Sequence, residues 1–116
     1  MTTDNYRKIT GIIVGCGNRG QNYAVYARHF PERFRLIAVA DPRAVVREKL
    51  QKLYSLDDKY VYDDWRRLAE PDVERLADCA LVTLPDREHY PAVIELAKKG
   101  YHILLEKPMA TKLEHC

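Results

Sequence analysis

Three glycines and one aspartate have the types and spacing to hold a phosphorylated ligand. Gly15, Gly17 and Gly20 follow an apolar run over 12–14, and Asp41 lies twenty-one positions after the third glycine. Glycine tolerates positive φ and has no side chain, so such a loop can turn sharply and expose its amides to a phosphate. A carboxylate can accept hydrogen bonds from ribose hydroxyls. The spacing is therefore typical of a dinucleotide site.

Each loop residue has a predicted role. Gly15 turns the chain, Gly17 lets a pyrophosphate approach the backbone, and Gly20 lets the next helix pack closely. Asn18 and Arg19 begin that helix and would direct backbone N–H groups and the positive end of its dipole at the phosphates. The alternative is a glycine-rich turn that binds no ligand. Such a turn would not require Asp41 at the end of the next strand.

Charge near the predicted ribose favours NAD over NADP. Asp41 would repel a 2′-phosphate and bond a free 2′-hydroxyl. Arg43, two residues later, could offset part of that repulsion by pairing with a phosphate, which keeps NADP as the second candidate.

Length and composition fit one α/β domain, with a core over about 8–110. The 116 residues carry a formal net charge of +2 spread along the chain, which favours neither nucleic acid nor a membrane as partner. Three scattered cysteines, Cys16, Cys79 and Cys116, argue against disulfides and metal and for a cytoplasmic setting. Cys16 precedes a helix, which could lower its pKa; the simpler interpretation is a tolerated small residue.

Strand and helix patterns alternate along the chain. Strands are predicted over 10–15, 36–41, 60–62, 79–84 and 102–105. Helices are predicted over 18–30, from Pro42 through Tyr54, around Trp65 and Leu68, and after the break at Pro85-Asp86 as far as the Lys98-Lys99-Gly100 ending. This order predicts a Rossmann-type, doubly wound parallel sheet with helices on both faces.

The spacing of apolar residues predicts which face of two helices packs on the sheet. The first helix places four residues on one face: Tyr23, Tyr26, Ala27 and Phe30. The helix before 100 places three residues on one face: Val93, Leu96 and Ala97. We expect both stripes to mark the sides that pack on the sheet.

The chemically distinctive segments all follow predicted strands. Gly15, Asp41, residues 83–85 and the Glu106-Lys107 pair each stand at a carboxyl end. Ligands of open parallel sheets bind outside those ends, so four distant segments should meet at one cleft.

The last segment suggests a family. Glu106-Lys107-Pro108 after a fifth strand, together with the glycine loop and a turn from Pro85 to His89, resembles the Gfo/Idh/MocA oxidoreductases. The resemblance runs from about Lys8 to Thr111. It implies hydride transfer between a nicotinamide and a sugar, polyol or related hydroxy compound.

The resemblance also implies site roles. Gly15, Gly17, Gly20, Asn18 and Arg19 would form the pyrophosphate loop, Asp41 would hold the adenosine ribose, and Thr83, Leu84 and Pro85 would line the nicotinamide-side ribose. His89 would lie near that cleft, although a packing or capping role is equally supported. Glu106 would bond the nicotinamide ribose. Lys107 would be the catalytic lysine, stabilising an oxyanion on the substrate; the alternative is a surface lysine.

Members of that family carry a second, substrate-binding domain, which we expect to be absent here. Residues 111–114 have the form of a capping box, yet only two residues follow. An edge at 102–105 would then be open. Two hypotheses remain: the cofactor-binding half of a dehydrogenase, or a catalytically silent nucleotide-binding or interaction module. A methyltransferase explains Glu106-Lys107-Pro108 poorly. The sequence leaves homo-oligomerisation open.

Overall fold

A single parallel β-sheet forms the centre of the computed structural model, which describes residues 7–107 and 110–116. Its strand order is β3-β2-β1-β4-β5, and all neighbouring strands run parallel. The strands are β1 (Ile9–Val14), β2 (Phe34–Ala40), β3 (Val61–Tyr62), β4 (Cys79–Val82) and β5 (His102–Leu105). The chain moves outward from β1 to one edge and then returns through β4 to the other. The doubly wound prediction is confirmed.

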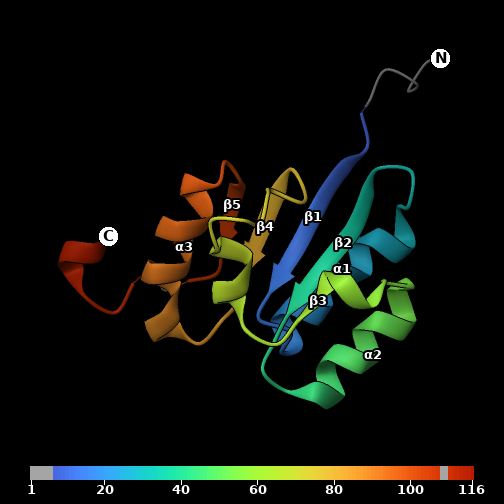
Figure 1. Cartoon of the computed structure of the whole chain (residues 1–116), viewed down its shortest axis with the longest axis horizontal. Coiled ribbons are helices and arrows are strands. Elements are labelled where there is room, and N and C mark those ends of the chain that lie inside the picture. The colour runs from blue at the N-terminus through green and yellow to red at the C-terminus, as the bar shows by residue number, and fades with distance from the viewer. Residues whose placement is uncertain (1–6, 108–109) are drawn as a thin grey trace.

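Helices cover both faces of this sheet (Figure 1). The three α-helices are α1 (Asn18–His29), α2 (Ala44–Tyr54) and α3 (His89–Lys98). Helices α1 and α2 pack on one face, with Ala24 and Leu50 in the same buried cluster as Ile13 and Val39. Helix α3 and the 3-10 helix Trp65–Ala69 cover the other face.

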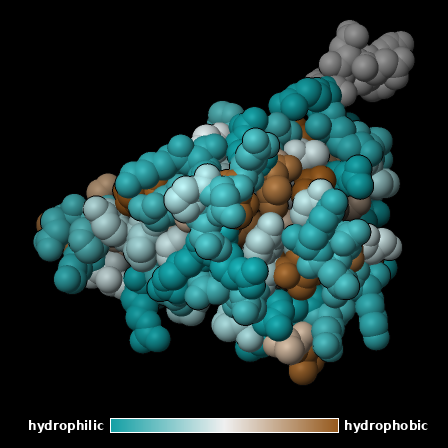
Figure 2. Space-filling view, viewed as in Figure 1, coloured by the Kyte–Doolittle hydropathy of each residue, from teal (hydrophilic) through white to brown (hydrophobic). Residues whose placement is uncertain are grey.

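Alternation along the strands divides the core into these two layers. Ile12 and Val14 face α3, whereas Ile13 faces α1 and α2, and all three are fully buried. The face of the molecule seen in Figure 2 is mostly hydrophilic, with smaller hydrophobic areas between the hydrophilic residues. The central strand is therefore covered on both sides, as its unbroken apolar sequence predicts.

The predicted stripe of α1 is wrong in part. Tyr26 and Phe30 are 45% and 41% exposed, while Gly20 and Ala24 are the buried residues of the helix. Tyr23 and Ala27 of the predicted stripe do pack against this core. The most deeply buried positions are nevertheless the small residues Gly20 and Ala24, which let the helix axis approach the sheet closely. In α3, similarly, Ala92 is buried with Leu96, and Ala97 is exposed.

Several predicted boundaries also shift. Helix α2 begins at Ala44, so Pro42 precedes the helix instead of lying in its first turn. Strand β4 ends at Val82, which leaves Thr83 and Leu84 in the loop beyond it. The capping box at 111–114 does not form; a 3-10 turn, Leu113–His115, begins there without a side-chain cap. The predicted end of helix α3 at Gly100 is confirmed. Gly100 has a φ of +94°, and its N–H donates to the carbonyl oxygen of Ala97.

Candidate functional site

A cavity of about 610 Å³ opens at the carboxyl ends of β1, β2, β3 and β4. It is bordered by the glycine loop, the residues after β2 and the residues after β4. The sequence-predicted residues on its lining are Gly15, Gly17, Asn18, Arg19, Asp41, Arg43, Thr83, Leu84 and Pro85. The structure thus brings three of the four predicted segments into one cavity.

The glycine loop is shaped by close contacts on one side and open space on the other. Gly15 has a φ of +96°, and a Cβ there would lie 2.7 Å from the backbone of Thr83 and Leu84. At Gly17 a Cβ would meet only the Arg43 guanidinium, at 3.6 Å. Gly15 is therefore required by the turn and by the backbone of the loop after β4, whereas the bare backbone at Gly17 faces the cavity.

Helix α1 leaves its first amides available to a ligand. Gly17 is its N-cap and makes no side-chain hydrogen bond to the helix, and its first turn contains no acidic residue. Unpaired N–H groups and the helix dipole together favour an anion at such an end. Because Gly17 and Asn18 also line the cavity, the amino end of α1 presents to it a surface that favours an anion.

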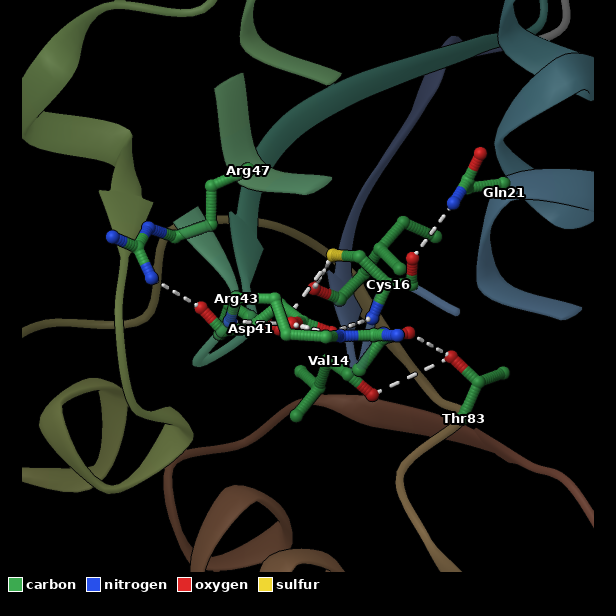
Figure 3. Close-up of polar contacts among 10 residues, drawn as sticks. Val14, Cys16, Gln21, Asp41, Arg43, Arg47 and Thr83 are labelled. Carbon is green, nitrogen blue, oxygen red and sulfur yellow. Dashed lines mark hydrogen bonds and ion pairs between the residues drawn. The ribbon is translucent and has the colours of Figure 1, made fainter. Parts of the chain in front are cut away.

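Asp41 follows β2 and is 3% exposed. Its Oδ1 accepts from the N–H and Nε of Arg43 at 2.8 and 3.0 Å, and its Oδ2 accepts from Arg43 Nη2 at 3.0 Å and the N–H of Cys16 at 2.8 Å (Figure 3). Burial alone would raise the pKa of Asp41, but these hydrogen bonds hold it below its ordinary value. The group is therefore an ionised carboxylate at the cavity wall.

Cys16 is a core residue. Its thiol is fully buried and lies 3.6 Å from the carbonyl oxygen of Ala40. Burial, reinforced by the charge of Asp41, raises the pKa of Cys16 to about 12. The suggestion that the helix end lowers this pKa is wrong, because desolvation and a neighbouring carboxylate both disfavour the thiolate.

The loop after β4 is tied to the glycine loop. The Thr83 hydroxyl donates to the carbonyl of Gly15 and lies 3.5 Å from that of Val14 (Figure 3). His89 is 1% exposed, and its Nε2 lies 2.8 Å from the carbonyl oxygen of Leu84. His89 therefore contacts the Leu84 carbonyl from the buried side of the loop, and it is not among the residues that line the cavity.

Glu106 and Lys107 follow β5, beside the cavity but outside its lining. Glu106 accepts a hydrogen bond of 2.7 Å from the Tyr23 hydroxyl and pairs with Arg19 at 3.8 Å. The bond to Glu106 raises the pKa of Tyr23. Lys107 is exposed, and Pro108 lies outside the described residues.

Sequence reasoning missed two contributors. Residues 63–66 and Glu88 also line the cavity, with Trp65 donating to Glu88 at 3.3 Å. The position of 63–66 after a predicted strand was the available signal, because all carboxyl ends meet at this edge. Nothing in the spacing indicates the Tyr23–Glu106 bond, which joins residues 83 positions apart.

The part of the chain that the structure describes offers neither a metal-binding cluster nor a membrane-spanning helix. Over 7–107 and 110–116 there is no cluster of three or more His, Cys, Asp or Glu side chains that could hold a metal ion. No helix in that part of the chain has the length and apolar character to cross a membrane.

Solved structures resemble this chain over nearly its whole length. The WlbA dehydrogenase of Chromobacterium violaceum, solved with NADH and UDP-GlcNAcA, is 27% identical with a TM-score of 0.80; the match covers 96% of this chain and 30% of that one. An oxidoreductase from Thermotoga maritima is 28% identical with a TM-score of 0.78, covering 94% and 32%. The apo scyllo-inositol dehydrogenase of Lactobacillus casei, at 19% identity and a TM-score of 0.81 over 94% and 31%, shares the fold.

The chain therefore spans about a third of the length of these proteins. A family model described as an oxidoreductase family with an NAD-binding Rossmann fold matches residues 9–116. The match includes the glycine loop, Asp41 and the Glu106-Lys107 pair. This chain belongs to the Gfo/Idh/MocA oxidoreductase family and comprises its NAD-binding fold.

Proposed function

We propose that this chain is the nucleotide-binding half of an oxidoreductase that transfers hydride between NAD and a sugar, polyol or related hydroxy compound. The observation that carries the proposal is the shared cavity of about 610 Å³ bordered by Gly17, the amino end of α1 and Asp41. The bound substrates of similar proteins support the substrate class, since WlbA was solved with a nucleotide sugar acid. Three free cysteines support a reducing, cytoplasmic setting.

The residues at the cavity suit a dinucleotide. The α1 amides at Gly17 and Asn18 would bind the pyrophosphate, and the Asp41 carboxylate would accept from the adenosine ribose. Thr83, Leu84 and Pro85 would line the path to the second ribose. When bound, NAD supplies the hydride acceptor. What the protein contributes is a fixed position and a polar surface for the charged parts of the ligand.

The substrate side of the reaction would depend on Glu106 and Lys107. We propose that Glu106, held by Tyr23 at 2.7 Å, orients the nicotinamide ribose. The Lys107 ammonium would stabilise negative charge on the substrate oxygen as the carbonyl forms. His89 would act through Leu84, by fixing the loop that borders the cavity.

A second candidate is a nucleotide-binding module without catalysis of its own. It is favoured by the position of Lys107, which is exposed and does not line the cavity that holds Gly17 and Asp41. Turnover decides between the two: incubation of the purified chain with NAD and a panel of polyols and sugars would exclude the silent module if NADH formed.

Nucleotide binding itself is tested with one substitution in the loop. Titration of the chain with NADH, followed by nicotinamide fluorescence, should show saturable binding. Gly17→Ala should weaken it by at least about tenfold, roughly 1.4 kcal/mol, because a methyl group would occupy the approach of the pyrophosphate. The φ of −74° at Gly17 suits alanine, so the far-UV circular dichroism should match that of the parent. Equal NADH affinity for the two proteins would contradict the proposed phosphate site.

A further inference from the structure

Tyr23 joins helix α1 to the segment that follows β5. Its ring packs against the buried cluster on the α1 side of the sheet, and its hydroxyl donates to Glu106 Oε2 at 2.7 Å, across 83 positions of sequence. The spacing of apolar residues along α1 predicts a packing role for Tyr23. The bond to Glu106 gives the same side chain a second, polar role beside the cavity.

The Glu106 carboxylate is held at one oxygen and available at the other. Its backbone N–H donates to the Val82 carbonyl at 3.1 Å, which continues the pairing of β4 with β5 and fixes the base of the side chain. Within residues 7–107 and 110–116, the carboxylate contacts Tyr23 and Arg19, and both contacts are made to Oε2. Oε1 is therefore left to accept a hydrogen bond from a ligand hydroxyl.

Of these two contacts, the one with Tyr23 determines the orientation. Arg19 Nε lies 3.8 Å from Oε2, and the Arg19 side chain is 62% exposed, so water and salt weaken its attraction for the carboxylate. Arg19 also lines the cavity, where a bound pyrophosphate would compete for its guanidinium. The Tyr23 hydroxyl is shorter in reach and is carried by a packed ring. Because Glu106 raises the pKa of Tyr23, this hydroxyl keeps the proton that it donates at neutral pH.

We propose that Tyr23 is a positioning residue for the nicotinamide half of the cofactor, holding Glu106 in the orientation that accepts from the nicotinamide ribose before the nucleotide binds. This inference rests on the proposed function and deepens it. A glutamate side chain has several rotatable bonds, and ordering such a side chain during binding weakens affinity by about two- to tenfold. Tyr23 removes part of that loss, and it acts through Glu106.

Tyr23→Phe tests this role, because it removes the hydroxyl and keeps the ring that packs on the core. Each protein is titrated calorimetrically with NADH and with ADP, which shares the adenosine and the pyrophosphate but has no nicotinamide ribose. The dissociation constant for NADH should rise by about threefold, and that for ADP should not change. The fluorescence anisotropy of the bound nicotinamide should also fall, because Glu106 then holds its ribose less firmly. Damage to the packing of α1 would weaken both ligands alike.

Glu106→Ala completes a double-mutant cycle that separates an indirect role from a direct one. Alone, it should weaken NADH and leave ADP unchanged. In the Glu106→Ala background, Tyr23→Phe should have no further effect on NADH. Tyr26→Phe is the matched control, since it removes a hydroxyl from an exposed tyrosine of the same helix and should leave both dissociation constants unchanged.

Unchanged NADH affinity in Tyr23→Phe or in Glu106→Ala would overturn the role of Tyr23, as would an undiminished effect of Tyr23→Phe in the Glu106→Ala background. Failure of the parent chain to bind either NADH or ADP would instead overturn the proposed function. Circular dichroism of each variant checks folding. Tyr23→Leu also lacks the hydroxyl and should show the same selective loss of NADH affinity, so it carries the test if Tyr23→Phe is unstable.

Discussion

At the scale of single residues, the loop separates positions that shape the fold from a position that faces a ligand. Gly15 and Gly20 pack closely against Thr83 in the loop after β4 and against each other, whereas a side chain at Gly17 would meet only the Arg43 guanidinium. Asp41 belongs to both groups, because its carboxylate anchors the amide of Cys16 and also lines the cavity. Substitutions in this loop should therefore divide cleanly into those that alter stability and those that alter binding.

Gly20→Ala should destabilise the protein. A Cβ at Gly20 would meet the carbonyl oxygen of Gly15, Thr83 Oγ1 at 2.8 Å and Ile13 Cγ2 at 3.0 Å. Overpacking of this kind costs about 1–3 kcal/mol, although alanine is favoured over glycine in a helix by about 1 kcal/mol. Urea denaturation should show a lower free energy of unfolding. An increase would mean that α1 can move away from the sheet.

The Cys16 thiol should be unreactive in the folded protein. With its pKa raised to about 12 by burial, almost no thiolate exists at pH 8, and the side chain is inaccessible. A chromogenic disulfide reagent should therefore modify the exposed Cys116 quickly and Cys16 only after denaturation. Cys116→Ser provides the control, since the fast phase should disappear. Rapid labelling of Cys16 in that variant would contradict its buried position.

At the scale of elements, the amino ends of the strands are joined by a second carboxylate. Asp78, directly before β4, accepts from the N–H and hydroxyl of Thr10 in β1 at 2.9 and 3.1 Å. The backbone N–H of Thr10 is the main reason that the pKa of Asp78 lies below its ordinary value, and burial opposes it. This contact fixes β4 against β1 at the end of the sheet opposite the cavity.

Asp78→Ala should lower the free energy of unfolding at pH 7 by about 1–3 kcal/mol, because it removes partly buried hydrogen bonds to a charged group. Because the folded-state pKa is depressed, this contribution is present above the unfolded pKa of about 3.9 and is lost as pH falls through the folded value. The difference between parent and variant should therefore shrink in acid. Denaturation of the parent and the variant at pH 7 and pH 3 measures this difference. Thr10→Val, which removes the hydroxyl on β1 that donates to Asp78, is the matched second variant. A constant difference would exclude an ionised Asp78 as the cause.

The elements were largely predictable from sequence, and their packing faces were not. Apolar runs followed by Gly, Pro or Asp mark the first four strands, and β5, which is followed by Glu106, has its predicted bounds. The face of α1 was misjudged because periodicity weights large side chains, whereas Gly20 and Ala24 permit close contact with the sheet. Motif spacing likewise identified Asp41 but gave no indication that Arg43 covers it, since side-chain pairing depends on rotamers that a sequence does not specify.

At the scale of the whole molecule, the cavity exists only in the folded chain. Its lining comes from segments between Gly15 and Glu88, brought together by the parallel sheet. A nucleotide that occupies it must bind the folded state in preference to the unfolded one. Binding therefore stabilises the entire fold by mass action, by about 2.7 kcal/mol at a ligand concentration one hundred times the dissociation constant.

The adenosine half and the nicotinamide half of NAD should stabilise the folded chain to different extents. Residues proposed to hold the adenosine side, including Asp41 and the α1 amides, line the cavity, whereas Glu106 and Lys107 on the nicotinamide side do not, and Lys107 is exposed. We therefore expect ADP to raise the melting temperature nearly as much as NADH, and nicotinamide mononucleotide to raise it little. Thermal denaturation at matched ligand concentrations measures the shifts.

Gly17→Ala should abolish the shift with ADP while leaving the melting temperature without ligand close to that of the parent, because its Cβ faces open space. This control separates specific binding at the loop from general effects of an anion on a basic protein, which would persist in the variant. Equal shifts with the two half-cofactors would show that the loop after β5 closes over the nicotinamide side without further protein. In that case residues of this chain would hold both halves of the dinucleotide, and the nicotinamide half would add to the stability of the fold as the adenosine half does.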